Sequence, residues 1–323
     1  MENFSAKGEV PKEQCLWEAA SSGKLALVQE LAEDPLVNVN WGDAEYGRTA
    51  FYRACFFGKA DIVRYLMAHP RVDVNRKQKE TATPLCAAAS EAHREVIDVL
   101  LADPRVEVNE PWQESTTPFY MACAEGHEDV VATMLTHPRV DANRPKADNS
   151  SPLWIASQGG HLRVVQVLLA SARTIDTKRA SKWNGKQAAD HAHWASTQAK
   201  WPDVPYDDPA KRKRDCPLIM DLILSYEINP ASQKHHLRRQ PGVREHYIGH
   251  TFALVVFYTD GFVRIKRLRW FSSINRFMKI CSHLPLDLQM VLCNRMFGCA
   301  RDIILTKDSE PGFRWLARPT SWV

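Results

Sequence analysis

Two patterns of hydrophobic and polar positions alternate along the first two thirds of the chain. The first is an apolar stripe at positions i, i+1, i+4 and i+5, which places its members on one face of a helix. It is clearest in Val96, Ile97, Leu100 and Leu101, and in Val164, Val165, Leu168 and Leu169. The second is a run of small residues, as at 87–89 and 122–124, which lets neighbouring helices pack closely. The two patterns predict pairs of short helices.

A short motif marks where each pair begins. The motif is a tetrapeptide that begins with threonine or serine, at Thr49, Thr83, Thr117 and Ser151. Three of these residues precede proline. Threonine or serine is a favoured N-cap, and proline is tolerated at the first helical position because its missing N–H has no helical partner there. The step is 34 residues throughout, and Asn75, Asn109 and Asn143 keep the same step. A fixed period of this length predicts stacked repeats of one supersecondary unit.

These repeats resemble the ankyrin repeat over roughly residues 14–195. The unit has 34 residues instead of the family's usual 33, and the extra residue falls near His137-Pro138-Arg139-Val140. The resemblance implies an all-α fold, an ankyrin-repeat α-solenoid of about six units that are stabilised mainly by stacking. We expect an N-terminal tail (1–13), a repeat array (14–229) with an insertion at 198–215 in its last unit, and a small, mostly helical C-terminal domain (230–323).

The C-terminal region has its own apolar segments. Asp260-Gly261 lies between two of them, which is a hairpin signal, but the segment 252–258 lacks the alternation of a strand, so helices are favoured. Proline and an acidic residue early in the segment 283–288 predict a helix start. The expected buried stripe of that helix is Leu288, Val291, Leu292 and Met296.

The segment Leu284 to Leu292 also resembles the first helix of an F-box, which docks on a ubiquitin-ligase core. A related F-box-like ending, called PRANC, follows ankyrin repeats in poxvirus proteins. The resemblance implies that Leu284, Pro285 and Leu288 would contact the ligase core. It rests on nine residues and departs after them, so an ordinary packed helix is the competing interpretation.

Composition is that of a water-soluble intracellular protein. Hydrophobic residues make up 45% and charged residues 25% of the chain, as in globular domains. The N-terminus shows no signal-peptide pattern, and the longest apolar run, 252–258, is too short for a bilayer. Of the eight cysteines, Cys55 and Cys123 share one repeat position and are expected to be buried, reduced thiols. We expect a cytoplasmic location, with the nucleus as an alternative.

The sequence contains no pattern that predicts catalysis or a cofactor. Phosphate-binding glycine loops, the Gly-x-Ser-x-Gly elbow and the His-Glu-x-x-His zinc motif are missing from it. Three histidines recur at one repeat position, and hydrogen bonds between repeats are the expected use of His93, His127 and His161. The spacing of Cys281, His283, Cys293 and Cys299 matches no standard zinc finger, so no metal is expected.

The resemblance also predicts where a partner would bind. In ankyrin-repeat proteins partners lie on the concave face, formed by the finger-loop tips and the ends of the first helices. The corresponding candidate residues are Tyr46, Arg48, Phe56, Phe57, Lys79, Glu80, Glu91, Gln113, Glu114, Glu125 and Asp148. Exposed aromatic residues with a charged rim are typical of binding hot spots. Either Phe56 or Phe57 could instead fold beneath the finger loop.

We therefore expect a non-catalytic scaffold that binds a partner protein. The rival hypothesis is a substrate-recruiting adaptor of a ubiquitin ligase, and an enzyme ranks third. Ankyrin surfaces bind by shape, so the sequence leaves the partner unidentified.

A basic run lies in the predicted insertion. Lys211, Arg212, Lys213 and Arg214 follow Pro209, and an exposed, extended run of this kind is typical of a nuclear-import signal. A solvated loop is the alternative. Nucleic-acid binding is disfavoured because it usually needs a broader basic surface.

Overall fold

The computed structural model describes residues 10–79, 82–198, 208–259 and 286–296. Throughout these ranges the regular elements are helices, accompanied by isolated bridges at Gly42–Thr49 and Trp112–Thr116. The all-α prediction is confirmed. The chain divides into two compact bodies, which are described separately: an N-terminal body of residues 1–130 and 139–152, and a C-terminal body of residues 131–138 and 153–323.

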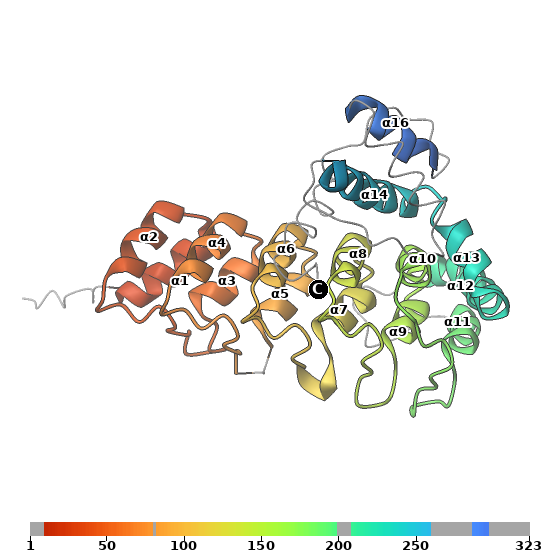
Figure 1. Cartoon of the computed structure of the whole chain (residues 1–323). Helices are drawn as coiled ribbons and strands as arrows, with labels where there is room; N and C mark the ends of the chain where they lie inside the picture. Colours follow the sequence, from red (N-terminus) through yellow and green to blue (C-terminus); the bar gives the residue numbers. More distant parts are fainter. Residues whose placement is uncertain (1–9, 80–81, 199–207, 260–285, 297–323) are drawn as a thin grey trace, which may run out of the picture. The chain divides into compact units, whose positions relative to one another are not determined.

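The N-terminal body is built from helix pairs. Figure 1 shows the first helix of each pair (α1, α3, α5, α7) in one row and the second (α2, α4, α6) in another, and contacts run between neighbours within each row. The finger loops extend beyond the first-helix row. The helices are α1 Lys12–Ser22, α2 Leu25–Glu33, α3 Ala50–Phe56, α4 Ala60–Ala68, α5 Pro84–Ser90, α6 Arg94–Ala102, the 3-10 turn η1 Gln113–Ser115, α7 Pro118–Glu125 and α8 Glu128–Thr136, which continues into the C-terminal body.

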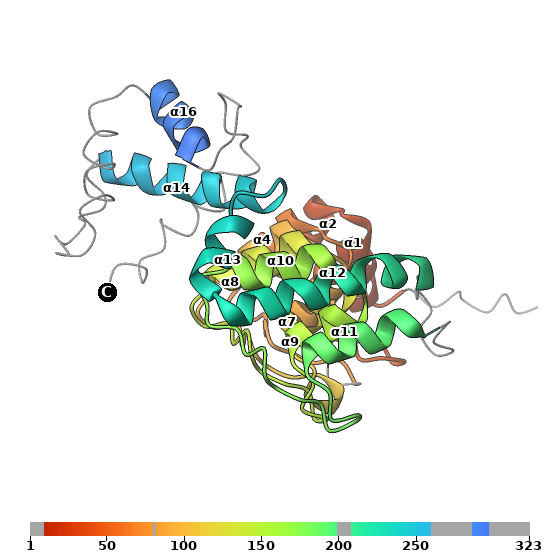
Figure 2. The ribbon, with the colours of Figure 1, turned by 90° about the vertical axis from the view of Figure 1, so that its right-hand side faces the viewer.

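The C-terminal body begins with the same helix pair and then departs from it. Its helices are α9 Pro152–Gln158, α10 Leu162–Ala170, α11 Ala188–Thr197, α12 Pro209–Ile228, α13 Pro230–Leu237, α14 Val243–Thr259 and α16 Leu286–Met296. Figure 2 shows α11 and α12 side by side, and α13 packs against both α10 and α12. Helix α14 contacts α10 and α16. The predicted domain boundary at residue 229 is therefore bridged by packing, and the division itself stays a prediction.

The 34-residue period is confirmed by the helix starts. Helices α3, α5, α7 and α9 begin at residues 50, 84, 118 and 152. Thr49, Thr83 and Thr117 precede three of them, and each side-chain Oγ1 accepts a hydrogen bond of 3.1–3.2 Å from the backbone N–H three residues on. These contacts are the N-caps that the sequence predicted.

The apolar stripes form the core, as predicted. Val96, Ile97, Leu100 and Leu101 are all buried on α6, and the four corresponding residues of α10 are buried as well. Cys55 and Cys123 are free and fully buried, and burial raises the pKa of both thiols. A buried thiol with a raised pKa is a poor nucleophile, so these side chains act as small core residues.

Of the three recurring histidines, His93 and His127 link neighbouring repeats, as predicted. The ring Nε2 of His93 is 2.8 Å from the carbonyl oxygen of Phe56, and Nε2 of His127 is 2.7 Å from that of Ser90. The ring of His93 also approaches Gly58, where a Cβ would lie 2.5 Å from Nδ1. Gly58 has a φ of +67°, so this turn requires glycine for both backbone and space.

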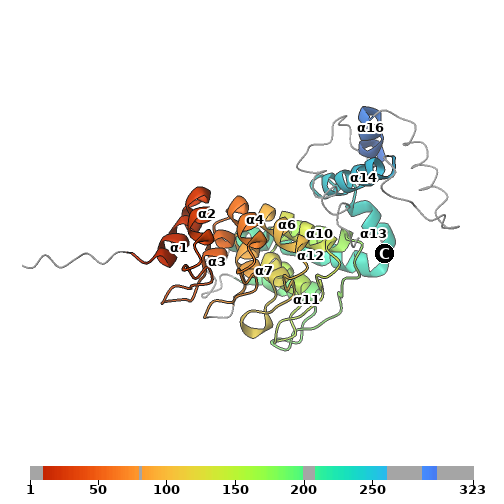
Figure 3. The same ribbon diagram turned by 60° about the vertical axis from the view of Figure 1, so that its left-hand side comes forward.

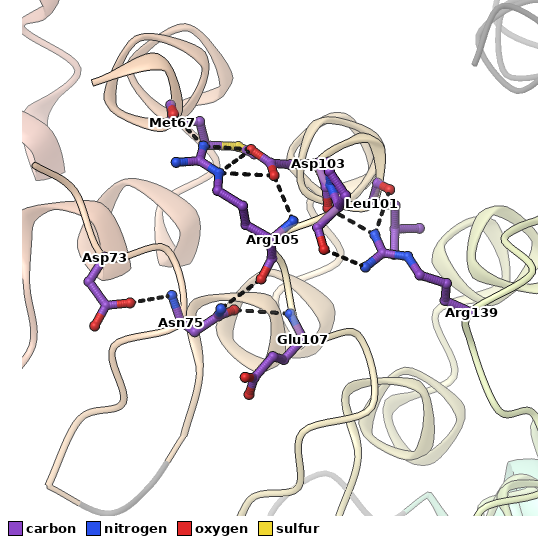
Figure 4. Close-up of polar contacts among 9 residues, drawn as sticks. Met67, Asp73, Asn75, Leu101, Asp103, Arg105, Glu107 and Arg139 are labelled. Carbon is purple, nitrogen blue, oxygen red and sulfur yellow. Dashed lines mark hydrogen bonds and ion pairs between the residues drawn. The ribbon is translucent and has the colours of Figure 1, made fainter. Parts of the chain in front are cut away.

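An arginine ladder joins the second helices of the N-terminal body (Figure 4). The guanidinium of Arg139 donates to the carbonyl oxygens of Leu101 and Asp103 at the end of α6, and to those of Pro104 and Val106 beyond it, at 2.8–3.3 Å. Arg105 reaches the carbonyl of Met67 at 2.6 Å and the carboxylate of its neighbour Asp103. Each arginine thereby satisfies helix-end carbonyls of the preceding repeat, which lack partners within their own helix.

An asparagine ladder runs beside it. Asn75 Nδ2 donates to the carbonyl of Arg105 at 2.8 Å, and its Oδ1 accepts from the backbone N–H of Glu107 at 3.0 Å. Asn40 and Asn109 make the same pair of bonds with the next repeat. The turn after each second helix, where the sequence analysis placed the extra residue of the unit, thus makes arginine and asparagine contacts that tie consecutive repeats together.

We expect Arg139→Met to lower the free energy of unfolding by about 2 kcal/mol, because four backbone carbonyls of the preceding repeat lose a charged donor while the apolar stem is kept. Urea-induced unfolding of the full chain measures the change. Arg76→Met is the matched control, since the exposed Arg76 makes no side-chain hydrogen bond to a described residue, and it should change stability by less than about 0.5 kcal/mol. Equal losses in both variants would contradict a role for the ladder.

The prediction that the insertion is an exposed loop is wrong for residues 209–215. Helix α12 begins at Pro209, and the side chain of Asp208 caps it by accepting from the N–H of Lys211 at 3.0 Å. Arg212 is only 2% exposed and donates to the carbonyl of Ala195 at 2.6 Å. A receptor that binds an extended segment would have to unwind this turn, so the structure does not favour the import signal, which remains untested.

In the C-terminal region, the described residues before Asp260 and after residue 285 form helices, as favoured over a hairpin. Residues 252–259 belong to α14, whereas Asp260-Gly261 lies outside the described residues. Helix α16 confirms the predicted helix. The expected stripe differs: Val291 and Leu292 are half-buried, while Gln289, Cys293 and Asn294 are buried. The packed face is therefore rotated relative to the prediction, and the side chains of Leu288 and Met296 lie outside the described set.

Candidate partner-binding surface

The ends of the first helices form one continuous row in the N-terminal body. Helices α1, α3, α5 and α7 contact one another in sequence, and Figure 3 shows their finger loops extending from the same side of the row. We call the C-terminal ends of these helices, together with the finger-loop tips, the first-helix face. Most of the predicted binding residues belong to it.

The two adjacent phenylalanines have different surroundings. Phe56 is half-buried and packs against a cluster of Tyr52, Ala82, Cys86 and Ala87. Phe57 is 39% exposed, and its ring meets that of Phe56 edge-on with centroids 5.1 Å apart. Thus Phe56 is partly a packing residue, while Phe57 presents an aromatic surface to solvent.

Arg53 links Phe57 to Trp17. Its guanidinium carbon lies 4.0 Å from the centroid of the Trp17 ring and 4.5 Å from that of the Phe57 ring. Its Nε donates to the hydroxyl of Ser21 at 2.9 Å. Burial, and then the charge of Arg48, lower the pKa of Arg53. Arg53 and Trp17 were not predicted as site residues, although Arg53 and Phe57 have the i, i+4 spacing that places two side chains on one helix face.

Carboxylates occupy the equivalent positions of the next two first helices. Glu91 caps the end of α5 and Glu125 ends α7, and both side chains are exposed. Neither forms an ion pair with another described residue. Gln113 and Glu114 are exposed on the η1 turn, and Glu114 pairs with Lys146. The row therefore carries a cation and an aromatic ring at α3, followed by acidic groups.

Several predicted finger residues hold the loops in place. The guanidinium of Arg48 lies over the ring of Tyr46, 3.9 Å from its centroid, and Nε of Arg48 donates to Gln78 at 3.2 Å. Exposed Lys79 donates its backbone N–H to the carbonyl of Tyr46 at 2.7 Å and its side chain to that of Ala44. Asp148 accepts from the N–H and hydroxyl of Ser150. These groups are largely committed to loop structure.

Other predicted residues fall elsewhere. Glu80, Leu284 and Pro285 lie outside the described residues, and of Leu288 only the helical backbone is described. The basic residues 211–214 belong to α12 in the C-terminal body: Lys211 Nζ contacts Nδ1 of His161 at 2.9 Å, and Arg214 pairs with Asp215.

Within the described ranges, no three histidine, cysteine or acidic side chains gather as a metal site would require. None of the helices in those ranges combines the length and apolar character needed to cross a bilayer.

The sequence matches a family model described as ankyrin repeats (3 copies), at residues 16–111 and 103–180. The two matches together cover about half of the chain, which therefore belongs to the ankyrin-repeat family. Repeats of this family are generally protein–protein interaction modules, and proteins that contain them are typically non-catalytic. No curated protein matches the sequence.

Proposed function

We propose that this protein is a non-catalytic interaction scaffold that binds a partner protein on its first-helix face. The observation that carries the proposal is the exposed ring of Phe57, which lies in a row of first-helix ends next to a half-buried Phe56. An aromatic side chain that stays exposed among polar neighbours is typical of an interface hot spot.

Polar groups on the same face support the proposal. Glu91 and Glu125 are exposed further along the row, and Gln113 and Glu114 are exposed on the η1 turn of a finger loop. Interfaces usually combine a small apolar centre with a polar rim, which contributes orientation more than affinity. We therefore place Phe57 at the centre of the contact, and the carboxylates at its edge.

We expect Phe57→Ala to weaken binding of the main partner by at least about 2 kcal/mol, roughly thirtyfold in Kd, because a hot-spot ring is lost. The tagged full chain and the variant would be used to purify partners from cell extract, and the recovered partner would then be titrated against both. Leu27→Ala is the matched control: Leu27 is 36% exposed but lies on the second helix α2. Its binding should be unchanged.

Melting temperatures must be measured for both variants. If Phe57→Ala leaves partner binding intact, or if Leu27→Ala weakens it equally, the first-helix face is not the binding surface. Phe56→Ala is a poor substitute, since Phe56 packs against the Tyr52 cluster and its loss would also reduce stability.

The same purification addresses the adaptor hypothesis. If residues 284–288 dock a ubiquitin-ligase core, ligase subunits should be recovered with the full chain and lost when residues 280–323 are deleted, while array partners remain. A complete lack of ligase subunits from the intact protein would end that hypothesis.

A further inference from the structure

Arg53 is held in place by packing more than by charge. Its guanidinium lies between the rings of Trp17 and Phe57, and a single hydrogen bond from Nε to Ser21 fixes its orientation. A planar guanidinium stacked on aromatic faces loses little further freedom when it binds. The group is thus pre-ordered on an exposed face.

Its terminal amino groups have no partner among the described residues. Arg53 forms no ion pair there, and its one side-chain hydrogen bond uses Nε. Other arginines of the N-terminal body are compensated differently: Arg64 pairs with Asp61 and Glu95, and Arg139 donates to four carbonyls. Burial, and then the charge of nearby Arg48, lower the pKa of Arg53, while the charge of Asp43 raises it.

We propose that Arg53 is an anion-recognition residue that binds a carboxylate of an acidic peptide segment in the partner, next to an apolar side chain that packs on Phe57. The two free amino groups of a guanidinium present parallel donors, which match the two oxygens of a carboxylate. This inference rests on the proposed function, because it names the chemistry of the partner at the same face.

The charges along the row favour a peptide over nucleic acid. Glu91 and Glu125 are exposed at the ends of the next two first helices. A polyanion lying along this row would meet both carboxylates, whereas a peptide can place an acidic residue at Arg53 and a neutral or basic one further on. Electrostatic complementarity of this kind sets the direction in which a segment binds.

The test uses a phage library of random twelve-residue peptides, selected on the full chain. We expect enriched peptides to contain aspartate or glutamate beside a bulky apolar residue. Replacing that acid by its amide should weaken the affinity for a synthetic peptide by about tenfold to a hundredfold, and so should Arg53→Gln. Combining the two changes should add little, because they remove the same interaction.

Two further variants keep the result interpretable. Arg53→Lys retains the charge but loses the planar fork, so it should recover only part of the affinity. Arg64→Gln removes an arginine from the second helix α4 and should leave affinity unchanged. Melting temperatures exclude unfolding as the cause of any loss.

The outcomes separate the two proposals. Peptides that lose affinity with Phe57→Ala but not with Arg53→Gln would overturn the role of Arg53 and leave the proposed function intact. Selected peptides that depend on neither residue would contradict both. A phosphoserine peptide that needs Arg53 while its glutamate counterpart does not bind, or a single-stranded DNA oligonucleotide that needs Arg53, would show that the carboxylate assignment is wrong.

Discussion

Leu168→Ala should lower the free energy of unfolding by about 2–5 kcal/mol, because the leucine is 0% exposed in α10 and its truncation leaves a cavity. Its neighbours Val164, Val165 and Leu169 are buried as well, so the site has little room to collapse. Urea-induced unfolding, followed by tryptophan fluorescence, measures the loss. Since repeats depend on their neighbours for stability, amide hydrogen exchange should also become faster in the adjacent helices.

Leu218→Ala is the matched control in the same body. Leu218 is also helical, but it is 51% exposed on α12, so its truncation should cost less than about 0.5 kcal/mol. A similar loss for the two leucines, or hydrogen exchange that accelerates only within α10, would count against a shared core.

The second large effect is expected on acidification. His191 is 0% exposed, its ring stacks on Trp154 with centroids 3.8 Å apart, and Asn184 Nδ2 lies 2.9 Å from its Nδ1. Burial, and then the charge of Lys186, lower the pKa of His191 to about 3. In the unfolded chain a histidine titrates near 6.5. Between the folded-state pKa of about 3 and the unfolded-state pKa of about 6.5, the unfolded state therefore binds more protons than the folded state. Stability falls as the pH is lowered through that window.

Lowering the pH from 7 to 5 should therefore cost the wild type about 2 kcal/mol more than His191→Phe, which keeps an aromatic ring but cannot bind a proton. Unfolding curves at both pH values measure the difference. His193→Phe, which removes an exposed histidine from the same helix α11, is the control and should behave like the wild type. A wild type and a His191→Phe variant with equal pH dependence would show that His191 is not buried as a neutral ring.

The repeat array could be predicted closely because its signals are local. The caps at Thr49, Thr83 and Thr117 depend on three or four consecutive residues, and the apolar stripes depend on helical spacing. The cross-repeat bonds of His93 and His127 were also predictable, since a polar residue recurring at one repeat position must find its partner at a similar place each time.

The arginines of the ladder recur with the repeat period, but their hydrogen-bond partners were not predicted from the sequence. Arg71, Arg105, Arg139 and Arg173 recur every 34 residues. Their partners are backbone carbonyls of the preceding repeat, as for Arg139 with Asp103 and Val106. Carbonyls carry no sequence signature, so the pairing could be found only in three dimensions.

The segment at 209–215 was predicted to lie in an exposed insertion but is helical. Pro209 occupies the first turn of α12, where proline is tolerated, and Asp208 supplies the cap. Burial of Arg212 against Ala195 is a tertiary contact across the altered last repeat. No local pattern distinguishes such an arginine from an exposed one.

The candidate site was predicted only in outline. The position of Phe57 followed from the repeat pattern, but its contact with Arg53 and Trp17 joins two repeats and could not be derived from spacing alone. Tyr46, Arg48 and Lys79 were expected to face a partner, yet their contacts mainly join neighbouring finger loops. Exposure alone therefore does not distinguish a binding residue from one that supports a loop.

Amide hydrogen exchange of the full chain, with and without a saturating peptide selected on it, tests most directly whether partners bind the first-helix face. Binding there should slow exchange at the ends of α3, α5 and α7 and in the finger loops at 41–48 and 109–116, with little change in α2, α4 and α6. Protection confined to α2, α4 and α6, or to the C-terminal body, would contradict the proposed function.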